Sequence, residues 1–518
     1  MRTADLVVIC CYLTGILAIG CSFFRKSRTA KEFVSAGGAL PGWAVGLSIF
    51  GTYLSSNTFI GLPGKAYGED WNALAFSLSL PVAALAAHRY FMPFYRGGGA
   101  ISAYEHLEHR FGAWARTYAV TCYLLTQIAR MGTVMFGVAL ALRPLTGWDM
   151  RTIILIIGFT TTVYTLLGGI DAVIWTDVAQ SIVLLGGAIV ALVIILMGMP
   201  EGPTQALSIA WDEGKLGLGG FSADLTRSTF WVVLVYGLFI NLTNFGIDQN
   251  YVQRYHTAKS DAAAAQSLWL GALLYIPVSL LFLVIGSSLF SFYRVHPDEL
   301  GAIKQRVAEH RLTLEGKELT EANVGEMAGR LGDRDIGDRV FPSFIAGRLP
   351  AGLAGLVIAA IIAAAMSSVD SSLNSSATVS LYDLYQRYVR PGMDERQAMR
   401  FLHGATLGWG MVGTGAALAM LRVRSVLDAW WTLSGVFAGG MLGLFLLGLL
   451  SKRAGSKAAA IGVLVGLCVI IWLTFSPGSR LPERLWSPIH SNLIIVFGTC
   501  AIVLTGFVSA RLLAERRS

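Results

Sequence analysis

Long apolar stretches, separated by short polar segments, follow one another along almost the whole chain. A helix needs about 20 apolar residues to cross the hydrocarbon core of a bilayer, so these stretches predict membrane-spanning helices. Two longer polar segments, 200–228 and 294–345, interrupt the series, and we expect the second, which is highly charged, to be partly helical. The pattern predicts an all-α membrane protein with about thirteen spans: 5–24, 40–64, 71–93, 114–143, 151–168, 172–199, 229–249, 266–293, 350–380, 401–421, 425–450, 456–475 and 491–511.

The composition agrees with this pattern and excludes several classes of protein. Of the 518 residues, 54% are hydrophobic and only 14% are charged. A soluble protein carries about a quarter charged residues, so a soluble enzyme, a disordered protein and a fibre are excluded. The six cysteines all lie inside apolar stretches, so we expect no disulfide framework.

The net charge of +8 comes from basic residues placed between apolar stretches, so it predicts orientation rather than nucleic-acid binding. With thirteen spans, these residues fall on one side, which is then cytoplasmic. The N-terminus would lie outside and the C-terminus in the cytoplasm, in a multi-pass protein of the inner membrane. The charge flanks also argue against a cleaved signal peptide at 5–24. The basic residues are Arg25, Lys26, Arg28, Lys31, Arg96, Arg110, Arg116, Arg254, Lys259, Arg387, Arg390, Arg396, Arg400, Lys452, Arg453, Lys457, Arg511, Arg516 and Arg517.

The second span contains an unusual density of small and hydroxyl-bearing residues, in the sequence LSIFGTYLSSNTFIGLPG. Lipid cannot satisfy exposed backbone groups, so an interrupted helix survives only against protein or a wet cavity. One interpretation is a Gly/Ser face for helix packing. The other is an unwound segment near the midplane that offers carbonyl oxygens to a cation and helix ends to a substrate.

The ninth span carries a second oxygen cluster, in GLVIAAIIAAAMSSVDSSLNS. At helical spacing Ser367, Asp370 and Ser371 share one face, with Ser368 beside them. Hard cations prefer oxygen ligands of this kind. The alternative for the serines is hydrogen bonding to carbonyls of their own helix. That alternative does not account for Asp370, whose carboxylate is costly in a membrane without a partner.

Two further charges lie inside apolar spans. Arg130 is near the middle of the fourth span, where a charge is expensive and must find an anion. That anion is either a protein carboxylate or a substrate carboxylate, which the guanidinium fork matches in geometry. Asp177 lies near the cytoplasmic end of the sixth span, at the depth of Asp370. This acidic pair would suit a second cation or a proton.

A cation site together with an organic-anion site near the midplane is the pattern of secondary transport. The sequence contains no Walker A motif, so ATP is not expected to drive it. We find no nucleophile or metal constellation and therefore expect no enzyme activity. The expected partners are a small organic substrate, a cation and the lipid bilayer, with no nucleic acid and no obligate protein partner. A transporter-like membrane sensor is the alternative from another class.

At these motifs the chain resembles the sodium/solute symporter family. The segments that carry the resemblance are FPSFIAGRLPAGLAGLVIAAIIAAAMSSVDSSLNS, GGIDAVIWTDVAQ, LPGWAVGLSIFGTYLSSNTF and SAYEHLEHRFG. Within the family the chain is most similar to the bacterial sialic acid transporters, mainly around Arg130. The resemblance implies a LeuT-like core of two inverted five-helix repeats, 40–199 and 229–450. The first helix, 5–24, and the two helices in 456–511 would be additions to this core.

The resemblance also implies roles for individual residues. A principal Na⁺ site would use backbone oxygens of Gly51, Leu54 and Ala364 and the hydroxyls of Ser367 and Ser368. A second Na⁺ or proton site would use Asp177, Ser367, Asp370 and Ser371. The substrate site would comprise Ser55, Ser56, Thr58, Ser77, Arg130 and Asn241.

Three positions depart from the sialic acid transporters. Those members carry Gln where this chain has Ser77, Phe where it has Gly237 and Ser where it has Asp370. The two shorter side chains predict a wider or differently filled pocket. We therefore expect a carboxylate substrate, such as sialic acid or another sugar acid or monocarboxylate, without preference for sialic acid itself. A neutral sugar of the glucose or galactose type is the alternative substrate.

Overall fold

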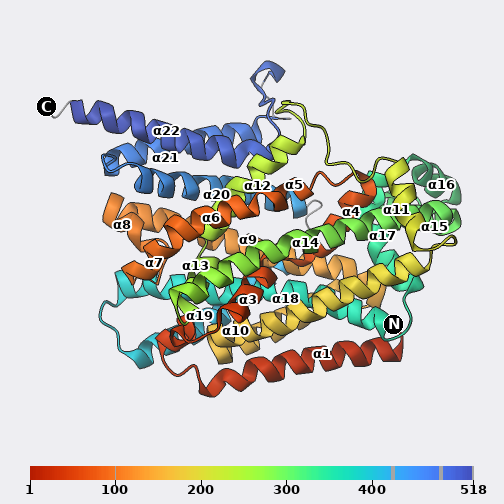
Figure 1. Cartoon of the computed structure of the whole chain (residues 1–518), viewed down its shortest axis with the longest axis horizontal. Coiled ribbons are helices and arrows are strands. Elements are labelled where there is room, and N and C mark those ends of the chain that lie inside the picture. The colour runs from red at the N-terminus through yellow and green to blue at the C-terminus, as the bar shows by residue number, and fades with distance from the viewer. Residues whose placement is uncertain (100, 422–425, 478–481, 516–518) are drawn as a thin grey trace.

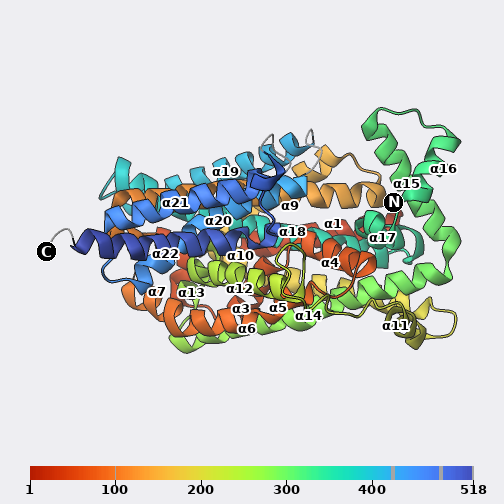
Figure 2. The same cartoon turned by 90° about the horizontal axis from the view of Figure 1, so that it is seen from above.

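The computed structural model describes residues 1–99, 101–421, 426–477 and 482–515, and within these ranges every regular element is a helix. Most of the long helices run roughly along the longest axis of the molecule (Figure 1). The N-terminus lies at one end of this axis, beside α15–α17, and the C-terminus lies at the other end (Figures 1 and 2). The chain therefore starts and finishes at opposite ends of the helix bundle.

Nine helices in the described part of the chain are long and apolar enough to cross a membrane, so the predicted total of thirteen is not confirmed. The predicted spans 151–168 and 172–199 are counted once in this total as α10 (Met150–Met197), but a kink at Gly169 (φ 57°, ψ −146°) divides α10 into two helical segments that match the two spans. The predicted span 401–421 is α19, which is long enough but not sufficiently apolar. The predicted span 425–450 begins at a residue outside the described part of the chain. Arg516 and Arg517, at the C-terminus, also lie outside it.

The remaining helices have the following bounds. The other long helices are α1 (Thr3–Ser22), α9 (Ala113–Thr146), α14 (Asp261–Val295), α19 (Glu395–Met420), α20 (Val426–Leu450), α21 (Ser456–Phe475) and α22 (Ile494–Glu515). The third span is made of α5 (Leu74–Leu78), α6 (Leu80–Ala86), a π-helical turn η3 (Ala87–Phe91) and α7 (Met92–Gly98). Short elements are η1 (Phe23–Arg25), α2 (Ala30–Ser35), η2 (Ala36–Gly38), α8 (Glu105–Phe111), η5 (Glu483–Leu485) and η6 (Ser491–Leu493).

The second predicted span is broken in the middle. Helix α3 (Gly42–Tyr53) stops at Leu54, whose backbone is extended (φ −92°, ψ 91°), and α4 (Ser56–Gly68) begins after Ser55. The Ser55 hydroxyl accepts the N–H of Thr58 at 3.4 Å and so caps α4. The expectation of an unwound segment between Gly51 and Thr58 is confirmed.

A second break was not predicted. The span expected at 229–249 ends as α12 (Phe230–Ile247), and a new helix, α13 (Gln249–Thr257), starts after the extended residue Asp248. The Asp248 carboxylate caps α13 by accepting the N–H of Asn250 at 2.8 Å. Each predicted repeat thus starts with a broken helix, and the division of the chain into 40–199 and 229–450 stays a prediction.

Helix α18 (Leu353–Val379), continued by the π-helical η4 (Ser380–Val389), lies at the centre of the bundle (Figure 1). It packs against α1, α3, α9 and α10. In its most apolar stretch of 18 residues, 89% of the residues are buried, compared with at most 61% in the corresponding stretches of the other candidate spans in the described part of the chain. Because neighbouring helices surround α18 on all sides, its polar residues face protein rather than lipid.

The charged segment 294–345 is helical, as expected, and forms α15 (Pro297–Glu315), α16 (Glu321–Arg330) and α17 (Asp333–Arg348). Together with α11 (Pro203–Asp212), these helices cover the N-terminal end of the bundle (Figure 2). Helix α17 lies directly on α4. A Cβ on Gly337 would come within 2.5 Å of the Gly64 carbonyl oxygen, so the two backbones touch where both residues are glycine.

Candidate functional site

A continuous cavity of about 2320 Å³ runs from the two helix breaks to the end of the bundle covered by α15 and α17. Tyr53, Arg130 and Asp248 line its deep part, where α3, α9 and α12 meet. Arg143 and Arg339 line its mouth. The cavity therefore connects the middle of the membrane with the N-terminal end of the molecule.

Arg130 lies half-buried on the cavity wall. Its Nη2 donates a hydrogen bond to the Thr52 carbonyl oxygen at 2.7 Å, a group left free by the end of α3. Among the described residues, no carboxylate lies within 4.0 Å of the Arg130 guanidinium. Asp248 shares the cavity wall, but its carboxylate caps α13. Arg130 therefore has no carboxylate in ion-pair contact among the described residues, and Asp248 is the carboxylate on which its charge acts.

The other predicted substrate residues fall into two groups. Ser55, Thr58 and Ser77 line the cavity, with 3.4 Å between the hydroxyls of the first two. Ser56 and Asn241 lie behind the wall. The Ser56 hydroxyl is 3.5 Å from the Val134 carbonyl oxygen. The Asn241 side chain accepts a hydrogen bond from the Tyr53 hydroxyl and donates to Ser79 Oγ at 2.9 Å, so Asn241 positions Tyr53 rather than facing the cavity.

Of the two expectations for the pocket, a wider or a differently filled one, extra room is not found at Gly237. A Cβ on Gly237 would lie 2.8 Å from Ser79 Oγ and 2.9 Å from the Phe76 Cα, because α12 packs directly on α5 there. Phe76 and Tyr236 line the cavity instead, with ring centroids 5.9 Å apart. The Ser77 hydroxyl accepts a hydrogen bond from Ser279 at 2.8 Å, so it is held in place beside these rings.

Aromatic residues that the sequence analysis did not single out surround the first helix break. Tyr53, the last residue of α3, lies 5.0 Å from the ring of Tyr275 and 5.6 Å from that of Tyr251. All three rings line the deep part of the cavity. Their position next to an unwound segment was the available signal, because such a ring can lie against the body of a bound organic solute.

The predicted principal cation site is assembled by contact between α3 and α18. The Ser367 hydroxyl is 3.0 Å from the Gly51 carbonyl oxygen and 3.3 Å from that of Ala364. The Ser368 hydroxyl is also 3.3 Å from the Ala364 carbonyl oxygen. Leu54, the fifth predicted ligand, is the buried residue at the break itself. This donor set consists only of neutral oxygens, which fits a hard monovalent cation.

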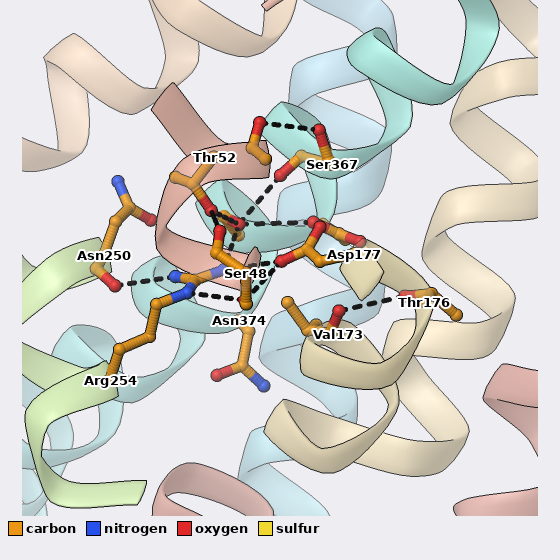
Figure 3. A network of polar contacts seen from close by, with 12 residues as sticks. Ser48, Thr52, Val173, Thr176, Asp177, Asn250, Arg254, Ser367 and Asn374 are labelled. Atoms are coloured by element: carbon orange, nitrogen blue, oxygen red, sulfur yellow. Dashed lines mark hydrogen bonds and ion pairs between the residues drawn. The ribbon is translucent and has the colours of Figure 1, made fainter. Parts of the chain in front are cut away.

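A second polar network lies beside this one and joins four helices (Figure 3). Ser48 Oγ donates to Asp177 Oδ2 at 2.5 Å. The Arg254 guanidinium donates to the same Asp177 oxygen at 3.0 Å, to Ser48 Oγ at 2.8 Å and to Ser371 Oγ at 2.7 Å. Thr52 Oγ1 lies 2.9 Å from Ser371 Oγ. Arg254 therefore links α13 to α3, α10 and α18.

Arg254 was counted among the basic residues that indicate orientation, but it is not a surface charge. The side chain is 1% exposed and forms an ion pair with Asp177, which is 0% exposed. Arg116 was misassigned in the same way, since it is buried against Asp383 at 2.6 Å and Glu108 at 2.9 Å. A buried carboxylate such as Asp177 needs a counter-charge, and that need was the signal for Arg254.

Asp370 completes this network from α18. Its Oδ2 accepts a hydrogen bond from the Tyr164 hydroxyl at 2.5 Å, and its Oδ1 lies 3.3 Å from Ser371 Oγ. Asp177 Oδ1 is buried without a hydrogen-bond partner among the described residues. The structure thus brings the four residues of the predicted second site into one network, in which two carboxylates face a single guanidinium.

The chain is similar to known sodium-coupled transporters over most of its length. The chain is 32% identical over 510 residues to the sodium/sialic acid symporter SiaT of Proteus mirabilis, which covers 98% of this chain and 94% of that protein. It is 28% identical to the human sodium-coupled monocarboxylate transporter 1, over 90% of this chain and 72% of that protein.

A solved structure described as a substrate-bound, outward-open Na⁺-coupled sialic acid symporter superimposes with a TM-score of 0.85. That match has 30% sequence identity and covers 99% of this chain and 98% of that chain. The model of the sodium:solute symporter family matches residues 33–466, which is most of the sequence. The chain therefore belongs to the sodium:solute symporter family.

Proposed function

We propose that this protein is a sodium-coupled symporter that imports a small organic carboxylate, such as sialic acid or another sugar acid or monocarboxylate. The observation that carries the proposal is the Arg130 guanidinium, which lies on the wall of a deep cavity without a protein carboxylate in ion-pair contact. A neutral sugar would leave that charge unpaired. The Arg130 fork, with the hydroxyls of Ser55 and Thr58 nearby, matches a carboxylate.

The relatives support the same class of substrate. One similar protein is named a sialic acid symporter and another a monocarboxylate transporter, and sialic acids and monocarboxylates both carry a carboxylate. Both relatives are named as sodium-coupled or sodium symporters, and this supports Na⁺ as the coupling ion. We propose the cytoplasmic membrane as the location, with the N-terminus and the mouth of the cavity outside.

Coupling follows from two adjacent residues that belong to different sites. The Gly51 carbonyl lies in the cation set with Ser367, and the Thr52 carbonyl accepts the hydrogen bond from Arg130. A Na⁺ that draws the end of α3 toward α18 therefore also fixes the position of Arg130. Substrate binding fixes the same end of α3 in return, so each ligand raises the affinity of the other.

Release to the cytoplasm requires that α3 and α18 separate on the inner side. The oxygens that hold Na⁺ come from both helices, so separation breaks up the ion site and the substrate site together. Outside Na⁺ then drives accumulation of the solute. A membrane potential that is negative inside contributes a further ~2.3 kcal/mol per charge per 100 mV.

The network around Asp177, Asp370 and Ser371 is the second proposed cation site. Arg254 supplies one positive charge to two buried carboxylates. One further monovalent cation, Na⁺ or a proton, would balance the pair.

Uptake by proteoliposomes tests the proposed function. Vesicles with an inward Na⁺ gradient are expected to accumulate a labelled organic acid above its outside concentration, and vesicles with an equal K⁺ gradient are not. Accumulation of neutral sugars but of no acid would refute the carboxylate assignment. Binding without accumulation would indicate a sensor.

Ser368→Ala is expected to raise the Na⁺ concentration needed for half-maximal uptake by about tenfold. The substitution removes one oxygen donor to a charged ligand, and such a contact is worth about 1.5–3 kcal/mol. The measurement is the Na⁺ dependence of uptake at fixed acid concentration. Ser372→Ala is the matched control, because Ser372 lies one turn further along α18, outside the proposed ion site, and its hydroxyl, like that of Ser368, bonds a carbonyl of its own helix. An unchanged Na⁺ dependence in Ser368→Ala would exclude this ion site.

A further inference from the structure

The outer part of the cavity is lined by basic side chains from three separate helices. Arg143 comes from the last turn of α9, His310 from α15 and Arg339 from α17. Arg306 of α15 and Lys65 of α4 lie on the same wall. Residues that are far apart in the sequence, four of them cationic, thus line one cavity.

The charges of Arg143 and Arg339 both act on the imidazole of His310. Partial enclosure by protein lowers the pKa of His310 below its usual value, and the positive charges of Arg339 and Arg143 lower it further. The guanidinium groups of α9 and α17 therefore act on the same imidazole of α15. At neutral pH this imidazole is uncharged and offers one N–H as a hydrogen-bond donor.

The acidic residues nearby do not neutralise this cluster. Arg311 is paired with Asp335 at 2.8 Å and Arg334 with Glu69 at 3.3 Å. In the described part of the chain, neither Arg143 nor Arg306 has a carboxylate within 4.0 Å.

Two more carboxylates line the same space. Asp338 lies near both Arg339 and Lys65, and Asp70 accepts the N–H of Asn72 at 2.9 Å. The four cations without a close ion pair, Lys65, Arg143, Arg306 and Arg339, thus share these two carboxylates, and an excess of positive charge remains.

We propose that Arg143, His310 and Arg339 form an outer anion subsite, which holds the carboxylate of an incoming organic acid before Arg130 takes it. The inference rests on the proposed function, since it assumes an acidic substrate. Arg130 and Arg143 lie on one helix and are separated by 13 residues, or about 20 Å of helical rise. A small acid cannot touch both, so the two arginines mark successive positions in one cavity.

The subsite is expected to raise the rate at which the organic acid enters the cavity and binds. A cavity with walls of one charge raises the local concentration of the opposite charge and accelerates binding by about tenfold or more. Salt weakens this effect, because the Debye length falls from about 10 Å at 0.1 M to about 3 Å at 1 M. Both the charge preference and its salt dependence can be measured.

The first experiment reads the charge of the cavity without reference to transport. In a variant with all six native cysteines replaced, Ser343→Cys places a thiol on α17, one helical turn beyond Arg339. Its reaction rates with an anionic and a cationic methanethiosulfonate are each divided by the rate of the same reagent with a free thiol. The ratio of the anionic to the cationic value then reports the charge of the cavity. We expect the anionic reagent to be favoured by about tenfold at low salt. Arg143→Gln with Arg339→Gln should bring the ratio close to one.

Arg330→Gln is the control for this experiment, because Arg330 is exposed, pairs with Glu326 at 2.6 Å and lies outside the cavity lining. It should leave the ratio unchanged. The melting temperature of each variant in detergent shows whether the protein is folded. A preference for the cationic reagent, or an anionic preference that survives the double substitution in folded protein, would overturn the subsite.

The second experiment measures acid uptake by the double variant Arg143→Gln/Arg339→Gln. The KM is expected to rise by about tenfold at low salt and much less at high salt. An unchanged KM at low salt would overturn the holding role. If the unsubstituted protein carries no acid at all, the proposed function fails instead, and the thiol experiment still decides whether the anion subsite exists.

Discussion

Arg130→Gln is expected to lower the uptake of an organic acid at subsaturating concentration by at least ~30-fold. Removing one partner of a desolvated charge pair costs about 2–5 kcal/mol, which corresponds to about 30-fold to several thousand-fold in affinity. Glutamine keeps much of the side-chain length but offers neither the charge nor the two parallel N–H donors. The measurement is the concentration dependence of Na⁺-driven uptake, which should show the loss mainly as a higher KM.

Two comparisons separate a substrate contact from a general defect. Arg130→Lys keeps the charge and loses the planar fork, so it should fall between the unsubstituted protein and Arg130→Gln. Na⁺ binding, measured as a Na⁺-dependent rise in melting temperature, should persist in Arg130→Gln, because the oxygens around Ser367 are intact. Acid uptake with an unchanged KM in Arg130→Gln would mean that this arginine does not bind the substrate.

Arg254→Met is expected to lower the stability of the folded protein by about 3–5 kcal/mol, the usual cost of leaving one buried charge without its partner. Arg254 is the counter-charge of Asp177, and both side chains are almost completely buried. Its guanidinium also holds Ser48 and Ser371, so α3, α10 and α18 lose a common contact. The measurement is the melting temperature of the purified protein in detergent.

The double variant Arg254→Met/Asp177→Asn tests whether pairing is the cause. It removes both charges, so part of the lost stability should return. Arg330→Gln is the control, because an exposed ion pair is worth less than about 1 kcal/mol and its loss should scarcely move the melting temperature. If Arg254→Met is as stable as the unsubstituted protein, the network around Asp177 does not hold these helices together.

The sequence allowed the first helix break to be predicted because the signal is local. Gly51, Ser55, Ser56 and Thr58 stand within eight residues of one another in an otherwise apolar span. The second break was missed because Asp248 stands at the end of the apolar stretch 229–249 and was taken as the polar end of a span, although Asn241, Thr243 and Asn244 precede it. Asp is a preferred N-terminal capping residue, so the start of a new helix at Asp248 could have been predicted. The boundary was instead placed from the apolar pattern alone.

The site residues likewise divide into those that spacing along the sequence could group and those that it could not. Ser367, Asp370 and Ser371 lie at helical spacing on α18, so spacing alone groups them, whereas the Gly51 carbonyl comes from α3. Arg254 could not be grouped by spacing, because its partner Asp177 is 77 positions away. A basic residue soon after an apolar span is usually an interface residue, and that general rule gave the wrong answer for Arg254 and for Arg116. The close packing at Gly237 was equally invisible, since it depends on the backbone of α5.

The backbone contact between Gly64 of α4 and Gly337 of α17 also matters for watching the protein at work. Two helices that touch without intervening side chains cannot slide apart freely, so α17 travels with the outer half of the broken span. The helices α15 and α16 precede α17 in the same charged segment, and in the proposed orientation they face outside. A dye attached there would change its surroundings at each turnover, so that single molecules could be timed optically while the transport pathway stays unlabelled.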